Sequence, residues 1–464
     1  MIPPIAVGLQ LKFANQICAM VALIKAAQLL LSLSILVVLH ELGHYWAARA
    51  FKTRVEKFYL FMNPGFSLFK KQIGETEWGI GWLPLGGYVK ISGMIDESMD
   101  KEQMKQEPQP WEFRSKPAWQ RLIIMLGGII VNLILGFAIY SMVLNVWGDS
   151  VLPADRVPYG MEVDDRLKPL GFQDGDQVLS INGETPETFK EIRRTLFFDQ
   201  VNEVQVQRDG NVVELTFDQD LGQLFVDSAI RQPFGLRMPC LVDRVVPGTG
   251  AAAGGLQAGD RFISIDGNPK RFYGEVTDYL QSHPSKEVVI EVLRMSGSKA
   301  EVVCQTDSSG ALGFIQAPPS EMSEFQMVDR TYTLGQSLSS GFTLAWTTLE
   351  EYVLSMRFLF SKSGASQVGS LVTFGSIFDA GWNWEIFWRN TAFFSLILAF
   401  MNLLPIPALD GGHVMFLLYE MIMRRPASEK FMEYAQTIGI ILLLGLMALA
   451  LGNDIWRVIT GQFG

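Results

Sequence analysis

The chain has 464 residues, more than one ordinary domain needs, and only 19% of them are charged while 48% are hydrophobic. This composition excludes a disordered or collagen-like chain, and three cysteines (Cys18, Cys240 and Cys304) are too few for a secreted disulfide framework. The formal net charge of −10 argues against nucleic acid as a partner, because nucleic-acid binding needs basic stripes.

Four long apolar runs predict membrane-spanning helices. They cover approximately residues 19–38, 122–147, 386–404 and 438–451, and several approach the length of about 20 residues that crosses the bilayer core. A signal peptide is the alternative for the first run, which continues well beyond the apolar core of such a peptide. We therefore expect a polytopic α-helical membrane protein with four transmembrane helices.

The distribution of Lys and Arg predicts the orientation. These residues are concentrated in the loop between the first two runs and in the loop after the third, whereas residues 148–330 carry an acidic excess. Cytoplasmic loops of membrane proteins are rich in Lys and Arg. We therefore expect both loops in the cytoplasm, and both termini and the acidic block outside it.

Residues 148–318 contain an internal repeat, in which GFQDGDQVLSING at 171–183 superposes on GLQAGDRFISIDG at 255–267. In each copy Gly-Asp opens a strand of alternating apolar residues, which ends in an Asn-Gly or Asp-Gly turn. The repeat resembles two circularly permuted bacterial PDZ domains, which implies a mixed α/β fold. A PDZ unit by itself binds or spaces partners and carries no chemistry.

Residues 334–360, after the repeat, combine helical apolar spacing with few charges. This pattern predicts an amphipathic helix at the membrane surface. The alternative is a helix packed against the repeat.

The sequence His40-Glu41-Leu42-Gly43-His44 stands at the cytoplasmic end of the first apolar run. On a helix the two imidazoles share a face, so both can bind one zinc ion while Glu41 reaches the water on the metal. On a soluble protein such a motif is often only a solvated helix face. Here it abuts an uncharged apolar run, where ionisable groups are costly and mark function.

A catalytic zinc ion needs a third protein ligand, and the sequence offers two candidates. Asp410 and His413 both follow the third apolar run, where Pro405 and Pro407 must break the helix. Non-helical backbone at membrane depth is buried in protein or lines a cavity. Histidine is the commoner ligand, so the chemistry of these residues alone leaves both candidates open.

Together these features resemble the site-2 protease family of intramembrane zinc metalloproteases, and within it the group that regulates sigma-E in Gram-negative bacteria. The resemblance rests on HELGH in the first membrane helix, LDGG at 409–412, and paired PDZ domains between the second and third helices. It implies one Zn²⁺ per chain bound by His40, His44 and Asp410, with Glu41 as general base. His413 then becomes a structural residue near the site.

The resemblance also assigns Asn402 a contact with the substrate or the transition state, in which its carboxamide donates to the developing oxyanion. The alternative for Asn402 is a hydrogen bond between helices. Residues 128–132 (GIIVN) match an element that packs closely on the helix of the active site, which places Gly128 and Asn132 near the metal.

Residues 66–91 resemble the membrane re-entrant β-loop of the family. In this interpretation Gly79, Ile80 and Gly81 form an exposed strand edge, to which the unwound substrate adds as a further strand. The alternative is an ordinary cytoplasmic hairpin.

The implied reaction is hydrolysis of a peptide bond within the transmembrane segment of a single-pass protein, in the lipid bilayer of a bacterial inner membrane. The implied substrates are an anti-sigma factor already trimmed by a first protease, and remnant signal peptides. The PDZ pair, expected in the periplasm, would exclude substrates that retain a bulky outer domain. The active site is expected toward the cytoplasmic side.

The expected organisation has eight parts. In chain order they are the N-terminal segment with the first helix (1–57), the β-loop region (58–120), the second helix (121–147), the two PDZ domains (148–238 and 239–318), the membrane-surface region (319–385), the third helix (386–418), and a cytoplasmic loop with the fourth helix (419–464).

Two other classes of protein compete with the protease hypothesis. A non-catalytic PDZ membrane scaffold would not need an intact HELGH motif with Asp410, and a metal or solute transporter would want polar groups along its helices. A separate hypothesis concerns Cys240 and Cys304, which both fall in the second PDZ unit on the oxidising side and could form a disulfide.

Overall fold

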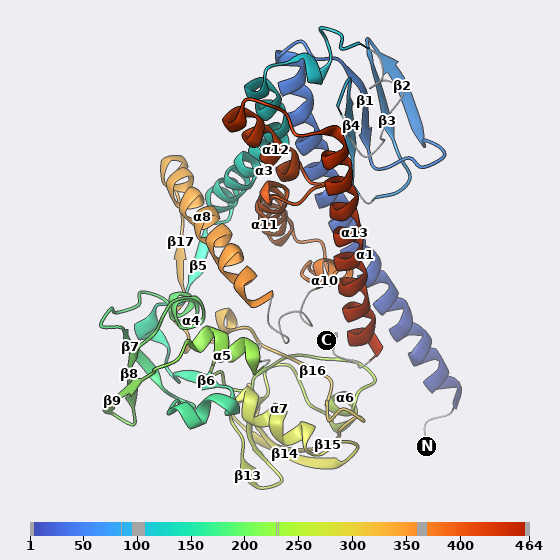
Figure 1. Cartoon of the computed structure of the whole chain (residues 1–464). Coiled ribbons are helices and arrows are strands. Elements are labelled where there is room, and N and C mark those ends of the chain that lie inside the picture. Colours follow the sequence, from blue (N-terminus) through green and yellow to red (C-terminus); the bar gives the residue numbers. More distant parts are fainter. Residues whose placement is uncertain are drawn as a thin grey trace. The chain divides into compact units, whose positions relative to one another are not determined.

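The structure, a computed structural model, describes residues 4–84, 86–94, 107–228, 230, 232–359 and 369–459. It divides into two compact units (Figure 1). The repeat unit is built mainly from Asp149–Arg330. The helical unit is built from Leu11–Gly148, Thr331–Met356 and Ser366–Gly464.

Four helices in the described part of the chain are long and apolar enough to span a membrane, over Ala19–Ala50, Ala118–Val146, Trp384–Leu403 and Lys430–Arg457. The four predicted membrane helices are thus confirmed. The first continues to Ala50, so the HELGH motif lies inside a helix and not at its end. The helices of the helical unit are α1 (Pro4–Ala50), α3 (Ala118–Val146), α8 (Leu334–Leu359), α10 (Leu371–Ser376), α11 (Trp384–Leu403), α12 (Asp410–Met423) and α13 (Glu429–Ile459), with a 3₁₀ turn at Phe113–Ser115.

Helices α1 and α3 touch through glycines. A Cβ atom added to Gly43 of α1 would overlap the carbonyl oxygen of Gly127 in α3, and one added to Gly127 would lie 2.5 Å from the carbonyl oxygen of Gly43. Small residues permit such backbone contact between membrane helices. Close packing matters there because the hydrophobic effect contributes little to helix association in lipid. The contact fixes the face that α1 presents to α3.

Polar side chains join α11 to the other two helices. The Thr391 hydroxyl donates to the Ser32 hydroxyl of α1 over 2.9 Å, and the Ser395 hydroxyl donates to the carbonyl oxygen of Asn132 in α3 over 2.6 Å. Such bonds between membrane helices each contribute about 0.6 kcal/mol on average. Helices α1, α3 and α11 therefore form one packed group.

The predicted amphipathic helix is present as α8. Its small residues Gly341 and Ala345 pack on α3, while Leu338, Phe342 and Trp346 form an exposed apolar stripe. The helix thus packs against an apolar helix through one face. Its place at the membrane surface stays a prediction.

The loop between α1 and α3 carries a four-stranded sheet with the order β2-β3-β1-β4 (Figure 1). Strands β1 and β3 are parallel, and the pairs β2–β3 and β1–β4 are antiparallel. The free edges are therefore β2 and β4. The strands are β1 (Val55–Leu60), β2 (Phe69–Ile73), β3 (Thr76–Ile80) and β4 (Tyr88–Ile91).

The prediction of a free strand edge at Gly79–Gly81 is wrong, because this segment lies inside the sheet. Gly79 is paired with Tyr59 on one side and with Lys70 on the other, and the Gly81 N–H donates to the Leu60 carbonyl over 2.8 Å. Close packing explains the glycine at position 79. A Cβ atom on Gly79 would overlap the ring of Tyr59.

The repeat unit contains two similar sets of elements. Outside both sets, β5 (Asp149–Val151) pairs with β17 (Val328–Arg330). The first set comprises β6 (Met161–Val163), β7 (Gln177–Ile181), α4 (Phe189–Phe198), β8 (Glu203–Arg208), β9 (Asn211–Thr216), α5 (Leu221–Asp227) and β10 (Phe234–Leu236). The second comprises β11 (Val242–Val245), α6 (Gly250–Gly254), β12 (Arg261–Ile265), β13 (Asn268–Pro269), α7 (Tyr273–Gln281), β14 (Glu287–Leu293), β15 (Lys299–Gln305) and β16 (Phe314–Gln316). Three 3₁₀ turns lie at Ala154–Arg156, Asp165–Leu170 and Pro319–Glu321.

The aspartate of the Gly-Asp motif has the same structural role in both sets. Asp176 and Asp260 are buried, and each carboxylate accepts a hydrogen bond from an arginine, Arg208 over 2.7 Å and Arg294 over 2.6 Å. A buried carboxylate without a cation would be strongly destabilising. The motif therefore anchors the strand that follows it to the end of the sheet.

The disulfide considered for Cys240 and Cys304 is not formed in the structure, where both side chains are buried free thiols. The sulfur of Cys304, in β15, packs against Gly254 of α6. Burial raises the pKa of both thiols, that of Cys304 to about 11. The two residues are therefore part of the apolar core of the second set and are poorly reactive.

Candidate metal centre

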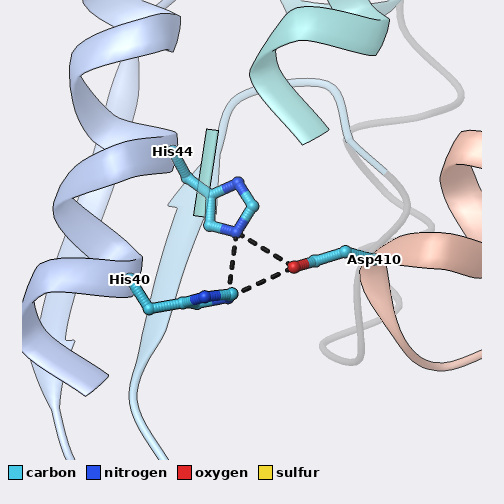
Figure 2. A group of neighbouring side chains, drawn as sticks. All are labelled: His40, His44 and Asp410. Carbon is cyan, nitrogen blue, oxygen red and sulfur yellow. Dashed lines mark hydrogen bonds and ion pairs between the residues drawn. The ribbon is translucent and has the colours of Figure 1, made fainter. Parts of the chain in front are cut away.

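The two histidines of the HELGH motif lie one turn apart on α1 and point the same way (Figure 2). His40 and His44 are both buried, and their Nε2 atoms lie 3.2 Å apart. A spacing of four residues puts both side chains on one helix face, as the sequence predicts. The two rings meet edge to face, which directs both Nε2 lone pairs to one point.

A broken helix brings a carboxylate to the same point. Helix α11 ends at Leu403, the segment with Pro405 and Pro407 is not helical, and α12 begins at Asp410. Asp410 Oδ2 lies 3.2 Å from the Nε2 atom of each histidine (Figure 2). Ala408, two residues earlier, has a φ angle of +83°, which costs a non-glycine residue of order 1–3 kcal/mol. This strained turn aims Asp410 at the imidazoles.

The three ligand atoms fit a tetrahedral metal ion. Their three separations are all 3.2 Å, and tetrahedral ligands at about 2.0–2.1 Å from zinc lie about 3.3 Å from one another. Asp410 Oδ2 is buried and has no hydrogen-bond partner among the described residues, so its lone pairs are available. Among the described residues, this is the one group of three or more such side chains that could hold a metal ion.

The second nitrogen of His44 has a partner that suits metal binding. His44 Nδ1 lies 2.8 Å from the carbonyl oxygen of Ile124 in α3, so Nδ1 carries the proton and donates it. The Nε2 lone pair is then free for a metal. A carbonyl in this position also fixes the orientation of the ring.

The second nitrogen of His40 lies 3.0 Å from the side-chain amide of Asn132. If His40 Nε2 binds a metal, Nδ1 must donate, and the amide must turn its oxygen toward the ring. Asn132 Oδ1 is buried and has no hydrogen-bond partner among the described residues. When the amide oxygen is turned to the ring, His40 Nδ1–H gains an acceptor. Asn132 therefore orients His40.

Gly128 leaves the room that the imidazoles occupy. A Cβ atom there would lie 2.5 Å from His44 Nε2 and 2.6 Å from His40 Cε1. Any side chain at this position of α3 would push the rings away from Asp410. Gly128 and Asn132, one helical turn apart, thus shape and orient the same two ligands.

The remaining predicted residues surround this group. Asn402, in the last turn of α11, places its Nδ2 atom 3.4 Å from His40 Nε2. Glu41 lies beside Gly87, the residue before β4, where an added Cβ would come within 3.2 Å of Glu41 Cγ. His413, one turn into α12, faces the same cavity but lies outside the group of three ligand atoms.

A cavity of about 440 Å³ opens beside the three ligand atoms. Its walls are His40 and Glu41 from α1, residues 88–91 of β4, residues 408–410 and Gln436 of α13. The expected β-loop at 66–91 includes β4, but the sequence did not identify this strand as the edge beside the metal ligands, and Gln436 was missed. The glycine pair before β4 was a signal for the strand, because Gly87 has no room for a side chain between α1 and β1.

Known proteins are similar to this chain over nearly its whole length. A model of Peptidase family M50 matches residues 28–446. The Regulator of sigma-E protease RseP of Salmonella typhimurium is 28% identical over 464 residues, and the alignment covers 93% of this chain and 98% of the relative. The protein of that name from Escherichia coli is 28% identical, with the same coverage. A Vibrio cholerae protein named as a candidate zinc metalloprotease is 26% identical over 92% of this chain and 98% of its own length. The resemblance found in the motifs is thus confirmed.

The first prediction concerns the third ligand. Asp410→Ala is expected to lose bound zinc, whereas His413→Ala is expected to keep about one zinc ion per chain, because His413 lies outside the ligand triangle. Metal analysis of the purified proteins tests this, with a thermal melt to show that both variants fold. Zinc lost from His413→Ala and retained by Asp410→Ala would reverse the assignment.

The second prediction concerns Asn132. Asn132→Leu removes the partner of His40 Nδ1 and is expected to weaken zinc binding about 10–100-fold, as loss of such supporting hydrogen bonds does elsewhere. Competition with a chelator measures the affinity. Asn145→Leu, on the same helix and remote from the ligands, is the matched control. Equal zinc affinity in the two variants would show that Asn132 does not orient the ligand.

Proposed function

The chain belongs to Peptidase family M50 and is a zinc metalloprotease, and we propose that it cuts peptide bonds within the transmembrane segments of single-pass membrane proteins. The observation that carries this proposal is the triangle of His40, His44 and Asp410 beside Glu41, set among helices apolar enough to span a membrane. Ionisable groups at membrane depth mark functional sites.

Each residue of the centre has a defined task. His40, His44 and Asp410 hold one zinc ion, which supplies Lewis-acid catalysis when bound. The Glu41 carboxylate accepts the proton of the attacking water and delivers it to the leaving amine. The Asn402 carboxamide, 3.4 Å from His40, donates a hydrogen bond to the oxygen that gains charge at the scissile carbonyl.

The substrate backbone adds to the edge of β4. A helical substrate must unwind before hydrolysis, and each N–H and C=O that it frees needs a new partner where water is absent. Strand β4 is a free edge of the sheet and lines the cavity of the metal centre, which supports this role. The substrate strand therefore adds at residues 88–91 and not at Gly79–Gly81.

The arrangement in the cell follows the charge distribution and the relatives. The protein is a multi-pass protein of the bacterial inner membrane. The Lys- and Arg-rich loops lie in the cytoplasm, which places the metal centre toward that side and both termini and the repeat unit in the periplasm. The repeat unit is a pair of PDZ domains that excludes proteins with an intact outer domain. The substrates are a trimmed anti-sigma factor and remnant signal peptides.

The third prediction tests the proteolytic function. Glu41→Gln is expected to keep its zinc and to cleave a labelled single-pass substrate about 10²–10⁴-fold more slowly, because the general base is lost while the ligands remain. Cleavage in proteoliposomes and metal analysis are measured together. Glu75→Gln, whose carboxylate is exposed and paired with Arg49, is the control. Cleavage by Glu41→Gln at the wild-type rate would exclude the mechanism.

The fourth prediction concerns β4. The Ser92 N–H donates to the carbonyl oxygen of Arg54, the residue before β1. Because N–H groups alternate between the two sides of a strand, the Val89 N–H, three residues earlier, points away from β1 to the open edge. Val89→Pro removes this donor and leaves the donors of β4 that face β1 in place. The substitution is expected to lower kcat/KM about tenfold, with zinc content and melting temperature unchanged.

Val89→Ala, which keeps the N–H, is the matched control for this prediction. Ile80→Pro behaves differently, because β3 is bonded on both sides and proline there disrupts the sheet. Full activity of Val89→Pro would remove β4 as the substrate edge.

A further inference from the structure

Helix α13 presents a buried amide to the cavity of the metal centre. Gln436 is only 6% exposed, lies two residues before the apolar run of α13, and forms part of the cavity wall. Its carboxamide makes no hydrogen bond to any residue that the structure describes. The amide atoms are not among the fully enclosed unpaired polar atoms of the described residues, so they are reached from the cavity. A molecule that enters the cavity can therefore bond to this amide.

The position of Gln436 relative to the metal ligands is fixed by a backbone contact. Gly439, one turn further along α13, packs so closely on the segment before Asp410 that an added Cβ would overlap the carbonyl oxygen of Pro407. Residues 436 and 439 share a helix face. The contact that sets α13 against the Asp410 segment therefore also directs Gln436 into the cavity.

The chemistry of the side chain identifies its partner. A carboxamide offers the same N–H donors and C=O acceptor as a peptide group. The cavity also contains the β4 edge, which binds one side of an extended chain and leaves the groups on the other side without partners. A peptide unwound in the membrane has such groups and no water to satisfy them.

We propose that Gln436 binds the substrate backbone in this cavity, through hydrogen bonds to peptide groups that β4 does not reach. The inference rests on the proposed cleavage of membrane segments and adds a substrate-binding residue on α13. Gln436 holds the extended chain beside the metal ligands and neither holds the metal nor transfers a proton.

Gln436→Met keeps the length and volume of the side chain and removes its hydrogen bonds. We expect kcat/KM for a labelled single-pass substrate to fall about tenfold, mainly through a higher KM, because one hydrogen bond to the substrate is lost. Zinc content is expected to stay at the wild-type level. The melting temperature is expected to stay near the wild-type value, since the volume of the side chain is kept.

Thr437→Val is the matched control. It lies on the exposed face of the same helix, and its hydroxyl bonds only within α13. Wild-type kinetics in Gln436→Met, or a loss of activity that follows a loss of zinc or of folded protein, would overturn the inference.

A cross-linking experiment separates this inference from the proposed function. Cysteine replaces Gln436, or Thr437 as control, in the inactive Glu41→Gln background with Cys18 changed to alanine, and the substrate carries one cysteine near its scissile bond. A disulfide at position 436 and not at 437 supports the contact even if no variant cleaves, in which case only the proteolytic function fails. Cleavage by the wild-type protein without any cross-link at position 436 refutes the contact alone.

Discussion

Two buried histidines and a partly buried aspartate, which meet among apolar helices, impose the constraint that the rest of the helical unit satisfies. His40, His44 and Asp410 meet with their ligand atoms 3.2 Å apart, and the acceptor atom of Asp410 is shielded from solvent. Removing one partner from a buried charge pair typically costs 3–5 kcal/mol. Such a cluster is therefore stable only when its geometry is held from several sides at once.

Each helix around the cluster contributes one part of that support. Helix α3 brings its backbone against the imidazoles at Gly128 and meets their outer nitrogens with Ile124 and Asn132. Helix α11 contributes Asn402 and the prolines that end it. The close contact of α1 with α3, at Gly43 and Gly127, is what brings these groups within hydrogen-bond distance.

The cavity has two walls of different chemistry. One wall is the edge of strand β4, whose backbone N–H and C=O groups form a row. The other is the face of α13 that carries Gln436. Both walls offer hydrogen bonds to a peptide that enters the cavity. An extended peptide matches this pattern better than a helix, whose backbone groups are already bonded to one another.

The sequence alone determined what depends on local pattern. Apolar runs predicted the four long helices, the spacing of four residues predicted a shared face for His40 and His44, and Pro405 with Pro407 predicted the break before Asp410. These features are fixed by helix periodicity and by the missing proline donor, which involve only neighbouring residues.

Only the tertiary structure decided which segments far apart in the chain meet. The sequence left Asp410 and His413 open as ligands on chemistry. It placed the strand edge at Gly79–Gly81, where Gly79 in fact accommodates the ring of Tyr59 and Gly81 the backbone of Met62. It gave no signal for Gln436, one of several polar residues in the first turns of α13. Strand order and helix contacts depend on pairing between distant residues, and a glycine needed for close packing has the same sequence signature as one needed for substrate approach.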